Sequence, residues 1–379
     1  MIDAQNVSSD VSSVPVPRPR LAFIDGMRAL AALCVVFFHA CSEQNNGHFE
    51  HRWLRLLPTW SAHFAVGVFI VLSGYCLMLP IARKGDKIGS LREFFRRRTM
   101  RILPPYYITL ALSILFIVTM AGRKTGSIWD INLPLKLDTV LAHILLIHDF
   151  PLHIQGGMIN YPLWSIAVEF QIYLLMPLIT WSLRIAGNLR TLLWTMSLGI
   201  LHFALHGRID SMVPWYVGLF TMGAIAARWC MQRPSKIDPR FAYVAWSLVS
   251  LTALVSITKG AGFVVGHFYI FDTVIGAATA ILLCTSYVDV SLKVNVFTRL
   301  LSWRPLEEIG IFSYSLYLIH APLLHLSNLL LTHFLHPSEP SMLFLIMLSI
   351  PAIIGLAKLF HLICEKPFMS KRPDATLKP

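Results

Sequence analysis

Residues 25–40 read DGMRALAALCVVFFHA, and this stretch decides the fold of the chain. It is apolar enough to predict a helix inside a membrane, yet it contains Asp25, Arg28 and His39. Ionisable side chains are costly in a membrane and mark candidate functional sites there. Because Arg28 and His39 are eleven residues apart, they share one helix face, about 16 Å apart along the axis. The alternative is that Arg28 reaches the membrane surface and His39 bonds to a neighbouring helix.

The rest of the chain has the same apolar character. Of its 379 residues, 55% are hydrophobic and 14% are charged, and the mean hydropathy is +0.62. Soluble domains carry about 25% charged residues. Apolar runs of membrane-spanning length recur from end to end, so we expect an all-α, polytopic membrane protein with about ten transmembrane helices. The expected spans are 22–41, 62–82, 102–121, 162–182, 191–207, 212–231, 242–258, 268–288, 309–333 and 341–364.

Positive charge predicts how these spans are oriented. In the ten-span topology, 23 of the 32 lysines and arginines lie in tails and loops on the side of the N-terminus, and 7 lie on the other side. Basic residues concentrate on the cytoplasmic side of membrane proteins, so we expect both termini in the cytoplasm. This topology explains the net charge of +12 without a nucleic-acid partner. The short run 137–150 is expected to be re-entrant or interfacial, with a full span as the alternative.

The polar ends of the chain delimit one membrane domain. Residues 1–20 predict a disordered cytoplasmic tail, residues 21–368 the membrane domain, and residues 369–379 a second cytoplasmic tail. The first segment lacks the charged start and the small-residue cleavage site of a signal peptide. We therefore expect the first span to remain in the membrane.

A basic stretch leads into the third span. Residues 91–107 read LREFFRRRTMRILPPYY, in which Arg98 and Arg101 are three apart and share a helix face. Guanidinium forks match phosphate oxygens, so the pair is a candidate site for a phosphorylated molecule such as coenzyme A. Binding of lipid headgroups is the alternative, and composition leaves both open.

A carboxylate lies inside the fourth expected span. Residues 161–171 read YPLWSIAVEFQ, where Ser165 and Glu169 are four apart on one face and Trp164 lies near the membrane surface. The expected topology places Glu169 at a depth similar to that of His39. Because a buried carboxylate needs a partner, we expect Glu169 to pair with that imidazole. A protonated glutamate bonded to another helix is the alternative.

A polar stripe follows in the ninth expected span. Residues 313–322 read SYSLYLIHAP, and Ser313, Tyr317 and His320 lie on one helix face. Such stripes often hold helices together, which favours a structural role for Ser313 and Tyr317 and leaves His320 open. Asp272 is a further buried carboxylate to consider.

The sequence predicts neither a disulfide framework nor a metal site. None of the six cysteines has CxxC spacing. The histidines at 143, 148 and 153 are five apart, a spacing that fits no compact pair of helical metal ligands. We therefore expect no bound metal.

The four quoted stretches, in this order, resemble the acyltransferase 3 family of bacterial membrane O-acyltransferases, and EKPF at 365–368 resembles the family's ending. The resemblance covers residues 21–368. It implies ten helices in the bacterial cytoplasmic (inner) membrane, an acyl-CoA donor used from the cytoplasm, and a hydroxyl of an envelope or exported carbohydrate as acceptor. The family's motifs fall on Arg28 and His39, on Arg98 and Arg101, and on Trp164, Ser165 and Glu169. Members often have Glu-Glu-Gln where this chain has Glu169-Phe170-Gln171, so the second glutamate is missing here.

These residues predict a mechanism of acyl transfer. We expect His39 to take the proton of the acceptor hydroxyl, and Glu169 to orient His39 or stabilise its cation. An acyl-histidine intermediate remains an alternative. Acyl-CoA, with acetyl as the expected acyl group, is a co-substrate rather than a resident cofactor. The expected partners are acyl-CoA, a free or lipid-linked carbohydrate and membrane lipids. The expected substrate-contacting residues are Arg28, Arg98, Arg101, Trp164, Ser165, Tyr317 and His320.

Two other classes of function compete with this interpretation. A transporter or flippase of a glycan-linked or acylated lipid would move its substrate without acyl transfer, and such proteins often contain repeats. No repeat is evident in this sequence. A structural or sensory membrane protein would use the polar stripes only for helix packing.

Overall fold

The computed structural model describes residues 21–43, 61–150, 156–205, 210–292, 296–335 and 339–369. Within these ranges the chain is helical and contains no strand. The expected all-α class is therefore confirmed for this part of the chain. The expected tail at 1–20, most of the tail at 369–379, and His153 lie outside the described residues.

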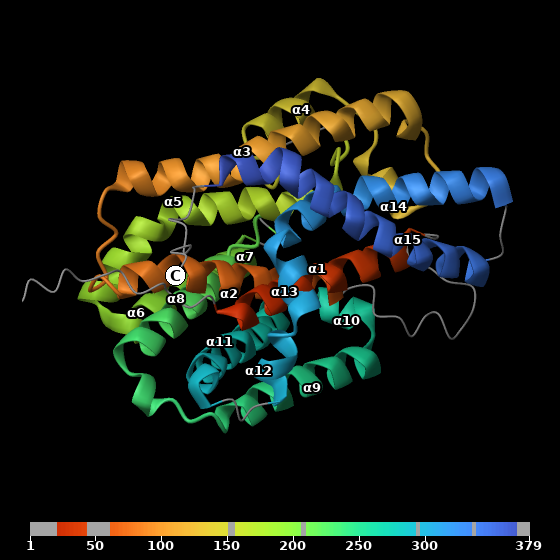
Figure 1. The fold of residues 1–379 in the computed structure, drawn as a ribbon. Helices are drawn as coiled ribbons and strands as arrows, with labels where there is room; N and C mark the ends of the chain where they lie inside the picture. The colour runs from red at the N-terminus through yellow and green to blue at the C-terminus, as the bar shows by residue number, and fades with distance from the viewer. Residues whose placement is uncertain are drawn as a thin grey trace, which may run out of the picture.

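Eight helices in the described part are long and apolar enough to cross a membrane. In Figure 1 they run roughly side by side, while the short helix α13 (Arg304–Ile311) crosses them. The chain is thus a multi-pass membrane protein. The eight helices are α1 (Ala22–Ser42), α2 (Ser61–Ala82), α3 (Leu91–Phe116), α5 (Trp164–Ile185), α9 (Phe241–Lys259), α11 (Phe268–Leu292), α14 (Ser313–Leu335) and α15 (Glu339–Phe360).

Two of the ten expected spans are not among these eight. The span expected at 191–207 is divided into α6 (Gly187–Ser197) and α7 (Ile200–Ala204). A turn at Gly199 separates them, and a Cβ atom there would collide with the ring of Tyr269. Composition alone could not show this break, because residues 191–204 contain no charged side chain that would mark an interruption.

The other unmatched span, expected at 212–231, is a single helix of 17 residues, α8 (Tyr216–Gln232). It packs along α2, and its central face is buried. Glycines allow this close approach, because a Cβ at Gly74 would collide with the carbonyl oxygen of Phe220, and one at Gly223 with that of Val71. The two backbones therefore lie in contact.

The run at 137–150 does not form a spanning helix. Its helix α4 (Leu137–Ile144) has eight residues and rises only about 12 Å, which agrees with the expected re-entrant or interfacial segment. The remaining short helices and helical turns are Ile117–Ala121, Ile128–Asn132, Tyr161–Leu163, Asp210–Met212, Pro234–Lys236, α10 (Ala261–Val265), α12 (Val296–Leu301), His361–Glu365 and Lys366–Phe368.

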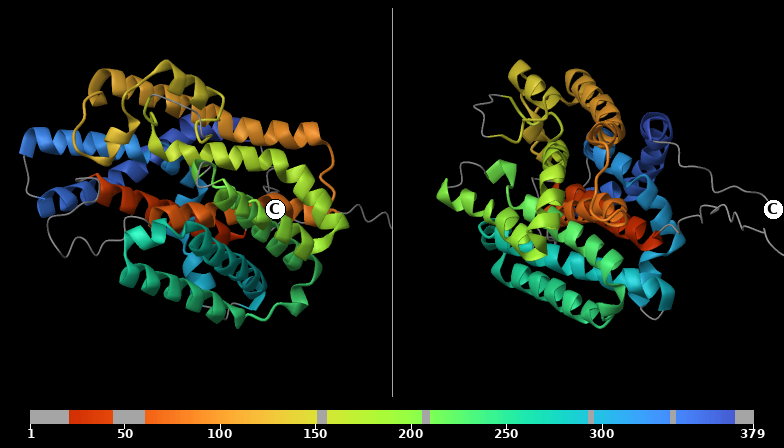
Figure 2. Two further views of the ribbon diagram at one scale, coloured as in Figure 1. Left: turned by 180° about the vertical axis from the view of Figure 1, so that it is seen from behind. Right: turned by 90° about the vertical axis from the view of Figure 1, so that its left-hand side faces the viewer.

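Helices α1 and α2 form the centre of the bundle. Figure 2, right, shows them nearly end-on with other helices on several sides. Helix α1 contacts α2, α13, α14 and α15, while α2 also contacts α8 and α11. The polar face of α1 is therefore directed at protein rather than at lipid.

An ion pair fixes the turn that follows α2. Asp86 is buried and accepts hydrogen bonds from the guanidinium of Arg228 on α8, at 2.7 and 3.1 Å. Asn188 on α6 and Gln232 on α8 complete the cluster. We call this side of the bundle, where α1 and α3 begin, the inner end, and the opposite side the outer end, after the expected topology.

Candidate functional site

A polar cavity of about 100 Å³, the inner cavity, lies between α1, α2, α3, α5 and α14. Six of the residues that the sequence predicted to bind substrate or to take part in catalysis line it, and they come from four different helices. The cavity thus collects side chains that are far apart in the sequence. These six are Arg28, Arg98, Arg101, Ser165, Glu169 and Tyr317.

The three arginines of the inner cavity have unused hydrogen-bonding capacity. Neither Arg28, Arg98 nor Arg101 forms a hydrogen bond or an ion pair with any other described residue. The Nε atom of Arg98 is buried without a partner. Buried donors of this kind are costly unless a ligand or water satisfies them. The cavity is therefore suited to an anion.

The neighbouring arginines on α3 behave differently. Arg96 and Arg97 form ion pairs with Glu93 on the protein surface, at 3.2 and 3.4 Å. Exposed pairs of this kind are worth little energy. They account for part of the basic stretch and leave Arg98 and Arg101 as the pair directed inward.

Glu169 does not bond to His39 among the described residues. Its Oε1 atom accepts hydrogen bonds from Ser73 on α2 at 2.6 Å and from Tyr173 on α5 at 2.5 Å. Glu365 also lines this cavity and accepts a hydrogen bond of 2.5 Å from Ser315. The cavity thus holds two carboxylates beside its three guanidinium groups.

His39 bonds to His320 instead, and the contact defines the state of both rings. The Nδ1 atom of His320 lies 2.7 Å from the carbonyl oxygen of Tyr317. The Nε2 atom of His320 lies 2.8 Å from Nδ1 of His39. A carbonyl only accepts, so Nδ1 of His320 carries the proton and Nε2 accepts from His39. Neutral His39 therefore keeps a lone pair on its own Nε2, which has no hydrogen-bond partner among the described residues.

A larger cavity of about 610 Å³, the outer cavity, lies where α2, α5, α8 and α11 begin. Its lining includes Trp164, which the sequence pointed to, and the ring of Tyr161, whose centroid lies 4.9 Å from that of His39. The His320 ring lies 5.6 Å from that of Tyr317 in the inner cavity. His39 itself lines neither cavity. It contacts Tyr161 of the outer cavity directly and is linked to the inner cavity only through His320 and Tyr317.

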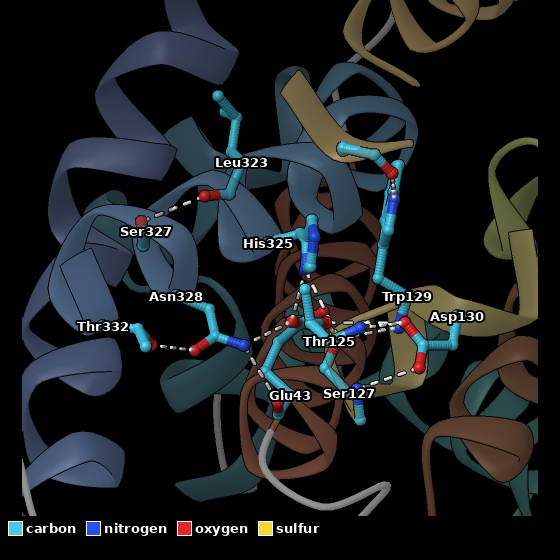
Figure 3. A network of polar contacts seen from close by, with 12 residues as sticks. Glu43, Thr125, Ser127, Trp129, Asp130, Leu323, His325, Ser327, Asn328 and Thr332 are labelled. Carbon is cyan, nitrogen blue, oxygen red and sulfur yellow. Dashed lines mark hydrogen bonds and ion pairs between the residues drawn. The ribbon is translucent and has the colours of Figure 1, made fainter. Parts of the chain in front are cut away.

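Sequence reasoning missed a buried network next to this histidine pair (Figure 3). Glu43, one turn after His39, lies 3.2 Å from Nδ1 of His325, and both side chains are fully buried. The ring of His325 stacks on Trp129 at 5.0 Å, and Asn328 donates to Glu43. This network joins α1 to α14 a second time. The only sequence signals were a glutamate directly after one apolar helix and two polar positions, His325 and Asn328, within another.

The remaining histidine and carboxylate predictions have mixed outcomes. Asp272 is fully buried and lies 2.9 Å from His63, a residue that the sequence did not single out. His143 and His148 stack with their ring centroids 3.8 Å apart. Among the described residues no three metal-ligating side chains gather into one group.

The fold and the site define a polytopic membrane protein with a hydrogen-bonded histidine pair next to residues of an arginine-lined cavity and of a largely apolar one. The sequence model of the acyltransferase 3 family, described as an acyltransferase domain, matches residues 21–358. The chain belongs to this family, which confirms the resemblance seen in the sequence.

Individual relatives agree with this assignment. The chain is 24% identical to the peptidoglycan O-acetyltransferase OatA of Listeria monocytogenes, over 91% of this chain and 55% of that protein. It is 24% identical to the O-acetyltransferase OatA of Staphylococcus aureus, over 92% and 57%. It is 34% identical to the acyltransferase MdmB of Streptomyces mycarofaciens, over 42% and 39%. The chain thus spans about half the length of these relatives. No solved structure matches it.

Proposed function

We propose that this chain is a membrane O-acyltransferase that moves an acyl group from acyl-CoA to a hydroxyl of a cell-envelope or exported carbohydrate. Membership of the acyltransferase 3 family and the O-acetyltransferases among its relatives support this proposal. Acetyl is the proposed acyl group. The proposed location is the bacterial cytoplasmic membrane, with both termini in the cytoplasm. Ten crossings would require α8 and the α6–α7 segment to span as well.

The inner cavity is the proposed donor site. Arg98 and Arg101 would bind the phosphates of CoA, because guanidinium groups without a protein partner are available for them. Arg28, which lines the same cavity, would guide the pantetheine arm. Ser165 and Tyr317, which share a hydrogen bond of 2.7 Å, line the same cavity, and the ring of Tyr317 lies 5.6 Å from that of His320. The thioester would thus reach the histidine from the inner end.

The single observation that carries this proposal is the Nε2 atom of His39, which has no partner among the described residues and belongs to a ring in contact with Tyr161 of the outer cavity. In the proposed reaction the acceptor oxygen attacks the thioester carbon while Nε2 takes the hydroxyl proton. The C–S bond then breaks, and the imidazolium returns the proton to the leaving thiolate. A thiol pKa of about 8.5 makes this thiolate a good leaving group. An acyl-histidine intermediate would use the same nitrogen as nucleophile.

His320 and Glu169 have supporting roles in this proposal. His320 would hold His39 in the tautomer that leaves Nε2 free. Glu169 does not contact the ring, so we propose that its charge offsets the imidazolium across the inner cavity. The hydrogen bonds from Ser73 and Tyr173 would keep this carboxyl group in position at the cavity.

The test is acyl transfer by the purified protein in lipid nanodiscs. Radiolabelled acetyl-CoA is supplied, and both CoA release and label incorporated into envelope glycan of a deletion strain are measured. We expect His39→Ala to lower transfer about 100-fold or more and to leave acetyl-CoA affinity unchanged. His333→Ala, an exposed substitution on α14, is the matched control. Full activity of His39→Ala would remove His39 as the base.

A transporter would give a different result in the same assay. Wild-type protein that releases no CoA and labels no glycan would contradict acyl transfer and favour movement of a lipid-linked substrate. Mass spectrometry of surface glycans from the deletion strain, compared with the complemented strain, would identify the acceptor and the acyl group.

A further inference from the structure

The outer cavity has the size and the lining of a ligand site. Its volume of about 610 Å³ falls within the range of about 300–1,000 Å³ usual for small-molecule pockets. Its walls include the large aromatic side chains of Tyr161, Trp164, Trp215 and Phe268. Among the described residues, no lysine or arginine lines it. The described lining therefore offers flat apolar surfaces and no lysine or arginine charge.

His63 is held in this cavity by a buried carboxylate. Asp272 is 0% exposed, and its Oδ2 atom lies 2.9 Å from Nε2 of His63 and accepts a second hydrogen bond of 2.8 Å from the indole of Trp215. The ring also stacks on Phe268, with centroids 3.8 Å apart. Because the carboxylate engages Nε2, the atom left for a ligand is Nδ1, which has no hydrogen-bond partner among the described residues. The orientation of His63 is thus fixed before a ligand arrives.

Tyr161 lines the same cavity, and it carries a second hydrogen-bonding group that lacks a protein partner. Its hydroxyl is buried and has no partner in the described part of the chain. A buried hydroxyl without a partner is unfavourable, so a ligand hydroxyl that reaches it would be a favourable partner. The same ring lies 4.9 Å from that of His39, centroid to centroid. A ligand bound to Tyr161 would therefore lie close to the proposed base.

We propose that the outer cavity binds the acceptor as a neutral sugar ring, with His63 and Tyr161 holding its hydroxyls and Trp164 covering its apolar face. A sugar ring presents C–H groups on its faces and hydroxyls at its edge, which matches aromatic walls with a few polar groups. A uronic acid or a sugar phosphate fits poorly, because Asp149 lines the cavity and no described basic side chain of lysine or arginine does. His63 is a positioning residue in this scheme, and its part in catalysis rests on the proposed function.

The first arm of the test measures binding without transfer. Saturation-transfer NMR of the full chain in nanodiscs uses methyl β-D-glucopyranoside as the probe and methyl β-D-glucuronide as its anionic counterpart. We expect the glucoside to bind, the glucuronide to bind at least about fivefold more weakly, and His63→Leu and Tyr161→Phe each to weaken glucoside binding about tenfold. His63→Asn, which offers an acceptor near the position of Nδ1, should restore much of the binding. The exposed variant His333→Leu is the control.

The second arm measures acylation of surface glycan in a deletion strain that expresses each variant at matched levels, together with acetyl-CoA affinity of the purified proteins. We expect His63→Leu to lower glycan acylation about tenfold with unchanged acetyl-CoA affinity. Full acylation by both His63→Leu and Tyr161→Phe, or a wild-type protein that binds no glucoside, would overturn the inference. If the glucoside binds in a His63-dependent way but the wild type transfers no acyl group, the sugar site stands and the proposed function fails.

Discussion

The inner and outer cavities differ in size, charge and chemistry. The inner cavity is narrow, about 100 Å³, and collects Arg28, Arg98 and Arg101 with hydrogen-bonding capacity unused. The outer cavity is about six times larger and is lined mainly by apolar and aromatic side chains. Burial lowers the pKa of His148 in its wall to about 3, so that ring is neutral at neutral pH. Positive charge is therefore concentrated in the inner cavity.

This difference indicates two ligands of different chemistry. Unpaired guanidinium groups favour phosphates, whereas aromatic walls with few polar groups favour a neutral ring. Substitutions in the inner cavity should then change donor affinity, and substitutions in the outer cavity should change acceptor affinity. Substitutions at the boundary should change turnover with little effect on either. Crossed effects between the cavities would contradict this division.

The largest effect is expected from the inner cavity. Replacing both Arg98 and Arg101 by alanine should weaken acetyl-CoA binding at least about 100-fold, because hydrogen bonds to charged groups contribute about 1.5–3 kcal/mol each. Equilibrium binding of acetyl-CoA to protein in nanodiscs measures this. The matched control is Arg96→Ala, on the same helix but paired with Glu93 at the surface. If the double variant bound acetyl-CoA with unchanged affinity, the alternative that Arg98 and Arg101 bind lipid headgroups would be favoured.

The second effect concerns the boundary. His320→Leu removes the acceptor for the Nδ1–H group of His39. The imidazole of His39 is then no longer held in one tautomer and one orientation. We expect turnover to fall about 10–100-fold, as for other residues that orient a functional imidazole, with acetyl-CoA affinity unchanged. His320→Gln keeps an acceptor oxygen and should recover part of the rate. A His320→Leu protein with wild-type turnover would show that the ring contact is only structural.

The His39–His320 pair also shows which parts of the site could be read from the sequence. The shared face of Arg28 and His39, and of Arg98 and Arg101, follows from helix periodicity and was predictable. The partner of His39 was not, because His320 is 281 positions away and the pairing depends on how α1 packs against α14. From its expected depth in the membrane, Glu169 was a reasonable partner for His39. In the structure the carboxylate of Glu169 instead accepts hydrogen bonds from the hydroxyl groups of Ser73 and Tyr173.

The same limit applies to the fold and to the outer cavity. Hydropathy located the eight long helices, since length and apolarity alone define a span. It could not reveal the break at Gly199, which depends on contact with Tyr269 from a distant helix. His63 was passed over for a similar reason, because its partner Asp272 is 209 positions away. Pairings between distant helices are a property of packing and not of local pattern.

A smaller effect is expected from the aromatic wall of the outer cavity. Trp164→Leu keeps an apolar side chain but removes the flat indole, which lies beside the His63 ring with centroids 6.1 Å apart. We expect the KM for the acceptor to rise about 5–10-fold, in line with about 1 kcal/mol for an aromatic contact, while acetyl-CoA affinity stays the same. Steady-state kinetics with varied acceptor and saturating acetyl-CoA measure this. A change in donor affinity alone would break the division between the cavities.

The smallest effect concerns Asp149, the carboxyl group in the wall of the outer cavity. Burial raises its pKa to about 6, although Gln171 donates hydrogen bonds to it at 2.8 and 3.0 Å. Because the folded pKa lies above the ordinary value of 3.8, the folded protein holds this proton more tightly than the unfolded chain. Stability from this group is therefore present at low pH and is lost as the pH rises from about 4 to 6.

Asp149→Asn imitates the protonated carboxyl at every pH. We expect the variant and the wild type to unfold at similar temperatures at pH 4.5, and the variant to be more stable by about 1 kcal/mol at pH 7.5. Thermal unfolding in nanodiscs at the two pH values measures the difference, with Asp138→Asn on α4 as the control for removal of a negative charge nearby. A variant less stable than the wild type at pH 7.5 would mean that the ionised carboxylate has a favourable partner. A partner of that kind would bring positive charge or strong hydrogen-bond donors to the outer cavity. The contrast with the arginine-lined inner cavity would then be smaller than we infer.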